Sequence, residues 1–334
     1  MREKTLTLHK LFDAFGEKKV LIIGDVMIDA YIFGKVSRIS PEAPVPVVDV
    51  FRKTTRLGGA ANVALNVKSL DATPILCSVI GDDEGGFEMS QLLFDEGMTT
   101  DGLIPGINRK TTKKHRVIGN STQMLRIDEE DTHPLTPKEE KQFLTRIQEI
   151  VDNEEIHVVI FQDYDKGSIT PTIIKQVTKW AQERHIPVVV DPKKRNFLSY
   201  RNVTLFKPNL KEMMEGLNIK INTNDLASIQ KGIKKLHDVL HPQMTMVTLS
   251  EHGIAMQHDD HFSHFPAHLR RIADVSGAGD TVISVAALCI ACGMEPDEIA
   301  KLSNLAGGLV CEQVGVSPID KERLLEEAES AKSN

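Results

Sequence analysis

A chain of 334 residues is long for one compact domain and short for two domains with separate cores, so we expect one large domain with a smaller appendage. Hydrophobic residues make up 41% and charged residues 26%, proportions typical of soluble globular proteins, which exclude extensive disorder. The formal net charge of −7 excludes a general nucleic-acid binder, because such proteins need a basic surface to neutralise phosphates.

The distribution of apolar residues argues against a membrane span or a signal peptide. No run approaches the ~18 consecutive apolar residues that a span requires, and residues 1–20 lack a continuous apolar segment. We therefore expect a cytoplasmic protein without membrane contact.

The cysteines, at positions 77, 289, 292 and 311, do not predict a disulfide framework in a chain of this length. Cys289 and Cys292 form a C-x-x-C motif within the apolar stretch VISVAALCIACGM, but no second ligand pair accompanies them. We interpret them as buried thiols rather than as a metal or redox site.

Apolar, β-branched runs alternate with amphipathic helical patterns along most of the chain. The expected strands lie at 19–29, 73–83, 156–164, 186–193, 203–209 and 244–253, and the first two helices at 61–72 and 85–98. Continuous apolar strands separated by helices indicate a parallel sheet that is covered on both faces. Ligands bind at the carboxyl ends of such strands. Those ends carry Asp25, Asp82, Asp163, Asp191, Asn209 and Ser250, so we expect one shared crevice there.

Two segments, at about 32–56 and 109–128, break this pattern because their apolar residues alternate with polar ones. The second contains a turn signal at Gly119-Asn120. Alternation of this kind indicates antiparallel strands, and we expect them to form a small separate sheet that acts as a lid.

Four histidines occur close together, at positions 258, 261, 264 and 268. Their flanks resemble two strands around an Asp-Asp turn, which is expected to scatter the imidazoles. We therefore favour a solvated hairpin over a metal cluster.

The stretch DVSGAGDTVIS, residues 274–284, places small residues directly before Asp280 and an apolar helix. A glycine-rich turn that feeds a helix leaves backbone N–H groups free, and the helix dipole favours an anion at that place. Asp280 could then take a proton from an attacking hydroxyl in phosphoryl transfer. The alternative is a simple helix start with an ordinary acidic residue in its first turn.

A second small-residue motif, LGGAANVALNV, places Gly58 and Gly59 before a helix with Asn62 in its first turn. Glycines allow close approach of a ligand, and the Asn62 amide can donate to and accept from a sugar hydroxyl. The alternative is a helix start with a buried asparagine.

Together, GGAANVALNVKSLDATPILCSVIGDDEGG and DVSGAGDTVIS resemble the two signatures of the ribokinase (PfkB-type) carbohydrate kinase superfamily. The resemblance spans nearly the whole chain, and one small departure is Val285, where the second signature usually has Ala or Gly. It implies a ribokinase-like α/β/α sandwich of three layers with a mainly parallel sheet, formed by residues 1–334 as one domain, plus a small antiparallel β lid.

The resemblance also implies roles for individual residues. Asp280 would be the general base, and the amides of Gly277, Ala278 and Gly279 would form the anion hole. Asp29, Gly58, Gly59 and Asn62 would hold the hydroxyls of the sugar. On the nucleotide side, Asn209 and Glu212 would organise Mg²⁺, through water, and the phosphates of ATP. Thr248, Ser250 and Gly253 would contact the nucleotide, and Asn304 would line the adenine pocket. Lys193, at the end of a strand, could face ATP or the substrate phosphate.

Family members commonly bind a monovalent cation such as K⁺, but the sequence does not locate its site here. The lid often pairs with the lid of a second subunit, so a homodimer is expected.

Within the superfamily, SRISPEAPVPV (37–47) and DYDKG (163–167) resemble the heptose 7-phosphate kinase branch. This resemblance implies phosphorylation of the anomeric hydroxyl of D-glycero-β-D-manno-heptose 7-phosphate to the 1,7-bisphosphate, a step of lipopolysaccharide core synthesis. A phosphorylated sugar needs cations at the far end of its pocket. The candidates are Arg38, Arg116, Arg126 and Lys166, although a lone cation on an exposed strand is often only solvated surface. Asp165 departs from the expected small neutral residue and is unfavourable near a phosphate unless it points away or pairs with Lys166.

No nucleotidyltransferase half follows within the 334 residues, so we expect another protein to perform the adenylyl transfer. Two other functions stay open at this point: a kinase of the same type for another sugar, sugar phosphate or nucleoside, and a non-catalytic protein that binds sugars or nucleotides.

Overall fold

The computed structural model describes residues 7–268 and 270–333. Within them, one large sheet has the strand order β13-β12-β11-β10-β9-β8-β1-β4-β5. The strands are β1 (Lys19–Gly24), β4 (Thr73–Gly81), β5 (Leu103–Gly106), β8 (Val158–Gln162), β9 (Val188–Asp191), β10 (Leu205–Phe206), β11 (Met244–Thr248), β12 (Ile254–His258) and β13 (His261–Phe265). Neighbours from β5 through to β11 pair in parallel, and β12 and β13 add an antiparallel hairpin at one edge.

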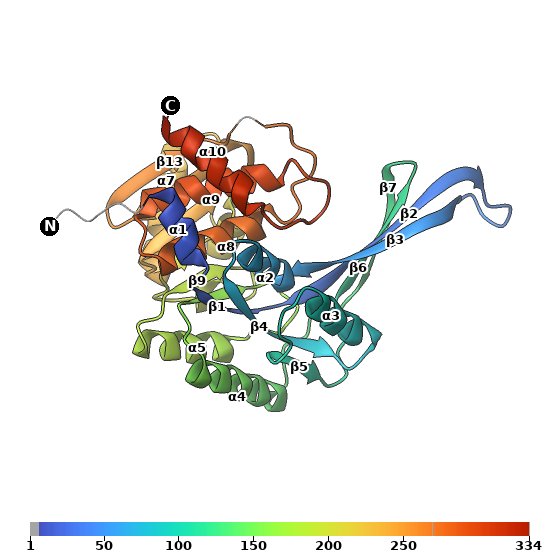
Figure 1. Cartoon of the computed structure of the whole chain (residues 1–334), viewed down its shortest axis with the longest axis horizontal. Helices are drawn as coiled ribbons and strands as arrows, with labels where there is room; N and C mark the ends of the chain where they lie inside the picture. Colours follow the sequence, from blue (N-terminus) through green and yellow to red (C-terminus); the bar gives the residue numbers. More distant parts are fainter. Residues whose placement is uncertain (1–6, 269, 334) are drawn as a thin grey trace.

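Helices cover both faces of this sheet (Figure 1). One layer holds α1 (Leu8–Phe15), α2 (Ala60–Ser69), α3 (Glu84–Asp95), α8 (Ala278–Ala291), α9 (Pro296–Val310) and α10 (Lys321–Ser333). The other holds α4 (Pro137–Asn153), α5 (Pro171–Glu183), α6 (Leu210–Leu217) and α7 (Leu226–Leu240). The predicted three-layer α/β/α fold with a mainly parallel sheet is therefore confirmed.

The continuous apolar sequence of β1 follows from its place in the middle of the sheet. Val20 and Ile22 belong to the core under α2 and α8, whereas Leu21 and Ile23 belong to the core under α4 and α5. Successive side chains of a strand point to opposite faces, so a strand with helices on both sides must be apolar at every position.

A second sheet projects from this body (Figure 1). Its strands, in the order β3-β2-β6-β7, are β2 (Val26–Ile39), β3 (Pro46–Gly59), β6 (Lys113–Gly119) and β7 (Thr122–Glu129). β2 and β3 form one antiparallel hairpin, β6 and β7 form another, and β2 pairs with β6 in parallel. The turn predicted at Gly119-Asn120 is present, with Asn120 and Ser121 at φ of 51° and 66°. We call this sheet the lid.

The histidine-rich segment forms the predicted hairpin, with the turn at Asp259-Asp260 between β12 and β13. The expectation that the hairpin scatters its imidazoles is wrong for one pair. His258 and His261 are directly opposite each other in the register, with ring centroids 5.1 Å apart. Opposed residues in an antiparallel pair project from the same face, which brings these two rings together.

The cysteines are free thiols, as expected, and burial raises the pKa of both Cys289 and Cys292. None of the helices formed by residues 7–268 and 270–333 is long and apolar enough to cross a membrane.

Candidate active site

The two glycine-rich motifs meet, because α2 and α8 begin next to each other. Asn62, in the first turn of α2, donates a hydrogen bond from Nδ2 to Oδ2 of Asp280, in the first turn of α8, at 2.8 Å. Gly277, which precedes α8, has a φ of 81°, and a Cβ at this position would lie 2.9 Å from Asn62 Nδ2. Backbone conformation and space therefore both require a glycine at position 277.

Asp280 is buried and accepts three side-chain hydrogen bonds. Besides Asn62, the hydroxyl of Tyr164 donates to Oδ1 at 2.7 Å, and Nε2 of Gln162 donates to the same oxygen at 3.1 Å. Burial raises the pKa of Asp280 to about 6, although the bonds from Asn62 and Tyr164 lower it. A carboxylate with a pKa near neutrality, fixed in orientation, is suited to act as a general base.

Polar contacts extend from Asp280 to a buried lysine. Gln162 Nε2 also donates to Oδ2 of Asp191 at 3.2 Å, and the same oxygen lies 3.0 Å from Nζ of Lys207. A Cβ on Gly279 would lie 3.8 Å from each of these two groups, so the first turn of α8 faces the buried ion pair. A lysine beside a helix N-terminus adds to the attraction of that end for an anion.

The predicted anion hole is the first turn of α8. No side chain caps this turn in the described structure, and Gly277 occupies the cap position. The N–H of Ala278 donates weakly to the carbonyl of Val275 at 3.3 Å, so one of the three predicted amides is engaged within the turn. An uncapped helix start of this kind leaves N–H groups available to a phosphate.

A buried carboxylate orients the loop that carries Tyr164. Asp25, at the end of β1, accepts the backbone N–H groups of Tyr164, Lys166 and Ser168 at 2.9, 3.1 and 3.0 Å. Burial raises the pKa of Tyr164 well above 10, so its hydroxyl remains protonated and donates to Asp280. Asp25, predicted only as part of the crevice, therefore holds the loop in place.

The predicted N-x-x-E element is a capping box at the start of α6. Asn209 Oδ1 accepts the N–H of Glu212, and Glu212 Oε2 accepts the N–H of Asn209, both at 2.8 Å. The other oxygen of Glu212 pairs with Lys193, whose Nζ lies 5.4 Å from the ring centroid of Tyr164. Burial lowers the pKa of Lys193, but Asp191 and Glu212 raise it more, so the group stays charged.

Thr248, Ser250 and Gly253 lie beside this element. Thr248 ends β11 and forms an isolated parallel bridge with Asn209. Ser250 begins a short 3-10 helix that ends before Gly253. Gly253 has a φ of 86°, and a Cβ there would lie 2.0 Å from the carbonyl oxygen of Phe265, so only glycine fits.

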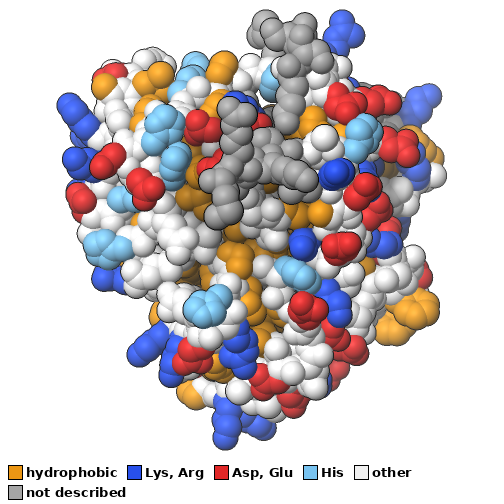
Figure 2. All heavy atoms as spheres, turned by 60° about the vertical axis from the view of Figure 1, so that its left-hand side comes forward, with side chains coloured by type: hydrophobic (Ala, Val, Ile, Leu, Met, Phe, Trp, Pro, Cys, Tyr) orange, Lys and Arg blue, Asp and Glu red, His pale blue; other side chains and the backbone are white. Residues whose placement is uncertain are grey.

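Asn304 lies on α9 and donates a hydrogen bond to the carbonyl of Pro266 at 2.8 Å. It lines a cavity of about 490 Å³ with residues of the loop after β13, of α9 and of α10. Figure 2 shows the face on this side of the molecule, where apolar side chains are exposed among charged and histidine side chains. The apolar part of this lining would suit the flat ring of a nucleotide base.

On the acceptor side, Asp29 pairs with Arg116 across β2 and β6. The Asp29 side chain is only 4% exposed, and a Cβ at Gly58 would lie 2.4 Å from its Oδ2. Gly58 is therefore needed to leave room for this carboxylate. Gly59, with a φ of 59°, precedes α2 and directs the chain from the lid into the helix.

The structure gathers three of the four predicted phosphate-binding cations on one side of the lid. Arg116 and Arg126 are directly opposite each other on β6 and β7. Lys166 lies 2.9 Å from Glu130, and Lys114, which the sequence did not single out, lies 3.1 Å from the same residue. Lys114 and Arg126 both contact Asp128, at 3.1 and 3.0 Å. We call Lys114, Arg116, Arg126 and Lys166 the lid cations.

The fourth cation, Arg38, is not part of this group. It lies nine positions beyond Asp29 on β2, which corresponds to roughly 30 Å along an extended strand. Asp165 does not pair with Lys166: its Oδ1 is buried without a hydrogen-bond partner among the described residues, and its φ is 57°.

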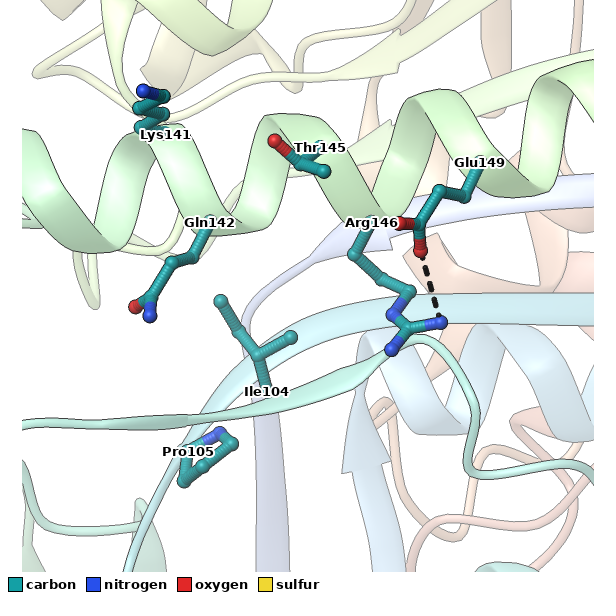
Figure 3. Close-up of a pocket in the computed structure, with 7 residues that line it drawn as sticks. All are labelled: Ile104, Pro105, Lys141, Gln142, Thr145, Arg146 and Glu149. Carbon is teal, nitrogen blue, oxygen red and sulfur yellow. Dashed lines mark ion pairs between the residues drawn. The ribbon is translucent and has the colours of Figure 1, made fainter.

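Another cavity, of about 350 Å³, lies between β5 and α4 (Figure 3). Its lining residues are Ile104, Pro105, Lys141, Gln142, Thr145, Arg146 and Glu149, none of which the sequence predicts as a site residue. Arg146 is already paired with Glu149 at 3.1 Å. We do not assign this cavity to the active site.

Four site residues were missed from the sequence: Gln162, Tyr164, Lys207 and Lys114. Gln162 is the last residue of β8, and Lys207 directly follows β10, so both occupy the carboxyl ends of strands where the crevice was expected. Their position at the carboxyl end of a strand was the sequence signal that could have identified them. From the sequence, Asp163 rather than Gln162 was named at the end of β8, and no lysine after β10 was considered.

The described residues fit ATP and Mg²⁺. The uncapped start of α8, with Lys207 and Lys193 beside it, offers N–H groups and positive charge to phosphates. Both oxygens of Glu212 are already engaged in the structure. A Mg²⁺ ion would therefore contact Asn209 and Glu212 through water molecules.

Comparison with known sequences gives the family. The family described as "pfkB family carbohydrate kinase" matches residues 17–322. "Bifunctional protein HldE" of Trichlorobacter lovleyi is 36% identical over 319 residues, covering 95% of this chain and 64% of the relative. The protein of the same name from Caulobacter vibrioides is 39% identical, covering 95% and 65%. The chain thus spans somewhat less than two thirds of the length of these relatives.

Solved structures share the fold at low sequence identity. Phosphofructokinase-2 from Escherichia coli, in complex with potassium, superposes with a TM-score of 0.79 at 16% identity, over 95% of this chain and 99% of that one. Arabidopsis thaliana ribokinase, with ribose and ATP, gives 0.70 at 17% identity, over 92% and 98%. Kinases of this family use ATP and Mg²⁺ and transfer phosphate to an alcohol group. From its two signatures, its fold and these matches, the chain belongs to the pfkB family of carbohydrate kinases.

Proposed function

We propose that this chain transfers the γ-phosphoryl group of ATP to the anomeric hydroxyl of D-glycero-β-D-manno-heptose 7-phosphate, with Asp280 as the general base. The observation that carries the kinase part is the carboxylate of Asp280, buried and held by three donors next to the uncapped start of α8. A base and an anion site side by side are what phosphoryl transfer requires of a protein.

In this mechanism, the proton of the anomeric hydroxyl passes to Asp280 as the oxygen bonds to the γ-phosphorus, and the bond from that phosphorus to ADP breaks. Among the described residues, Oδ2 of Asp280 accepts a hydrogen bond from Asn62 alone, so it keeps a lone pair for the proton. Bound Mg²⁺ would neutralise charge on the phosphates. The N–H groups of the first turn of α8 and Lys207 stabilise the transferring group, and Lys193 supports the nucleotide phosphates.

The lid cations support a phosphorylated acceptor. Arg116 and Arg126 are like charges in a directly opposed cross-strand pair, an arrangement that is unfavourable unless anions lie between or beside them. Asp29 and the two acids Asp128 and Glu130 supply part of that negative charge in this structure. We infer that the 7-phosphate takes over contacts to Arg116 and Arg126, while Asp29 turns to a sugar hydroxyl.

The choice of a heptose among sugar phosphates rests on SRISPEAPVPV and DYDKG, which resemble the heptose 7-phosphate kinase branch. We propose that a separate nucleotidyltransferase acts in the same pathway.

The test is ADP release with Mg·ATP against five acceptors: heptose 7-phosphate, fructose 6-phosphate, ribose, fructose and adenosine. The proposal expects turnover largely confined to heptose 7-phosphate. Preference for another acceptor would retain the kinase chemistry and reject the heptose. An absence of turnover with all five, combined with normal ATP binding, would favour a binding protein.

We also propose that two lids pair in a homodimer. Several large apolar side chains on the lid strands are exposed, among them Ile39, Phe51 and Leu125 at 61%, 72% and 55%. Such a surface is typical of a protein interface. Sedimentation analysis is expected to give a dimer for the wild-type chain and a monomer for Phe51→Asp; a monomeric wild type would reject the proposal.

A further inference from the structure

The hairpin β12-β13 and the start of α9 bring together a group of side chains that the kinase chemistry does not use. His258 ends β12, His261 begins β13, and Asp297 lies in the first turn of α9. One potential ligand atom from each lies within 4.8 Å of the other two. All three are at least partly exposed.

The spacing is close to that of a metal centre. Nε2 of His261 lies 3.3 Å from Oδ2 of Asp297. Two ligands of a tetrahedral zinc ion, each about 2.0–2.1 Å from the metal, are about 3.4 Å apart. His261 and Asp297 therefore already have the separation that a shared ion requires. The ring of His258 lies opposite that of His261 at a centroid distance of 5.1 Å, and one of its nitrogens lies within 4.8 Å of the other two ligand atoms.

The second oxygen of Asp297 points independently to a cation. Oδ1 is buried and has no hydrogen-bond partner among the described residues. The Asp297 side chain as a whole is 36% exposed and its Oδ2 is hydrogen-bonded to His261, so the unsatisfied acceptor is Oδ1 alone, and an acceptor removed from water without a partner is unfavourable. The nearby hydroxyl of Ser263 is bonded to Nε2 of His261 at 2.8 Å and does not satisfy Asp297. A positive ion between the rings and the carboxylate would remove this deficit.

We propose that His258, His261 and Asp297 bind a divalent transition-metal ion, of which zinc fits best, with water in the remaining position. Imidazole nitrogens favour zinc, nickel and copper, whereas magnesium prefers oxygen ligands, so this site differs from one used by Mg·ATP. Two imidazoles and one carboxylate are a common ligand set for zinc.

The site would tie the edge hairpin to α9. The same two elements contribute Phe265, Lys301 and Asn304 to the cavity of about 490 Å³ whose apolar lining would suit a nucleotide base. The metal would thus fix the relative position of two walls of that cavity without contacting Asp280. Its role is structural, and the inference does not depend on which sugar is phosphorylated.

The test is calorimetric titration of the tag-free, metal-stripped chain with zinc alone, for wild type, His261→Ala, Asp297→Asn and the control His264→Ala. His264 lies on the same strand but bonds to the carbonyl of His252 and is outside the cluster. We expect one high-affinity zinc ion per wild-type chain, binding at least about tenfold weaker in His261→Ala and Asp297→Asn, and unchanged binding in His264→Ala.

Two further readouts separate loss of the site from loss of the fold. Zinc is expected to raise the Tm of wild type and His264→Ala but not of His261→Ala, while all variants have similar Tm values without metal. Cobalt in place of zinc is expected to give the visible absorption of a four-coordinate site in wild type only. Equal zinc affinity in wild type and His261→Ala, or no saturable binding to wild type, would overturn the proposal.

Discussion

The centre where α2 meets α8 and the lid differ in how their polar groups are satisfied. At the centre, Asp280 is 4% exposed and its donors come from α2 and from the end of β8 and the loop that follows it. On the lid, Arg126 is 54% exposed and paired with an acid of its own strand. The centre is therefore preorganised, whereas the outer strand of the lid holds Arg126 on an exposed, replaceable partner. This difference suggests that the chemistry resides in the body and the choice of acceptor in the lid.

The largest effect is expected from Asp280→Asn, which tests whether the centre supplies the general base. If the centre supplies the base, kcat falls by about 10²–10⁴-fold, while the Kd for ATP changes little because the charged phosphate contacts remain. Steady-state kinetics with calorimetric ATP binding measure both. A variant with near-normal kcat would show that another group takes the proton.

Arg116→Ala tests whether the lid binds the phosphate of the acceptor sugar. Loss of a charge-assisted contact to the substrate phosphate is expected to raise the KM for the sugar phosphate by about 10–100-fold. The KM for ATP should stay unchanged, because Arg116 pairs with Asp29 on the acceptor side. An equal effect on both KM values would place Arg116 outside the acceptor pocket.

Tyr164→Phe tests the positioning of the base. Removal of a donor to the ionised form of Asp280 raises the pKa of that carboxyl, so the acid limb of kcat/KM, expected near pH 6 in wild type, moves to higher pH. Activity is lost as pH falls through this value, because the protonated base cannot accept a proton. We also expect kcat to drop by about tenfold.

The matched control for that variant is Tyr200→Phe. Tyr200 is also buried and donates to a carboxylate, Asp163, at 2.8 Å. Within the described part of the chain, the side-chain oxygens of Asp163 accept from Tyr200, Asn196 and the N–H of Asp165, and not from a group that binds Asp280. The acid limb should therefore stay where it is in wild type. A shift of similar size in both variants would attribute the effect of Tyr164→Phe to general loosening of the core.

The smallest effect is expected from Arg126→Ala. Its side chain is more exposed than that of Arg116, and exposed ion pairs contribute little, so the KM for the sugar phosphate should rise less than about fivefold. Parallel kinetics on both variants measure the ratio. A larger effect than that of Arg116→Ala would place the phosphate at the outer strand of the lid.

Much of the fold could be predicted because its signals are local. The apolar sequence of β1 and the polar residues that follow each parallel strand allowed the parallel sheet to be predicted. Gly119-Asn120 allowed one turn of the lid to be predicted. The glycine motifs also led to the resemblance that the family match confirms.

The contacts between distant segments could not be predicted. Asn62 and Asp280 are 218 positions apart, and no local spacing indicates that one donates to the other. The roles proposed for Asp29 and Arg116 remain predictions, and the ion pair between them follows from the register of β2 and β6, which the sequence pattern does not define. The turn at Asp259-Asp260 was predicted, but the pairing of His258 with His261 was missed, because it follows from the register that this two-residue turn imposes on β12 and β13.

The most direct test of the account is ³¹P NMR of the product formed from heptose 7-phosphate and Mg·ATP, with Asp280→Asn in parallel. The account predicts a new phosphate resonance coupled to the anomeric proton in the wild-type reaction, and none above background in the variant. A phosphate on any other carbon, or an equal yield from the variant, would contradict it.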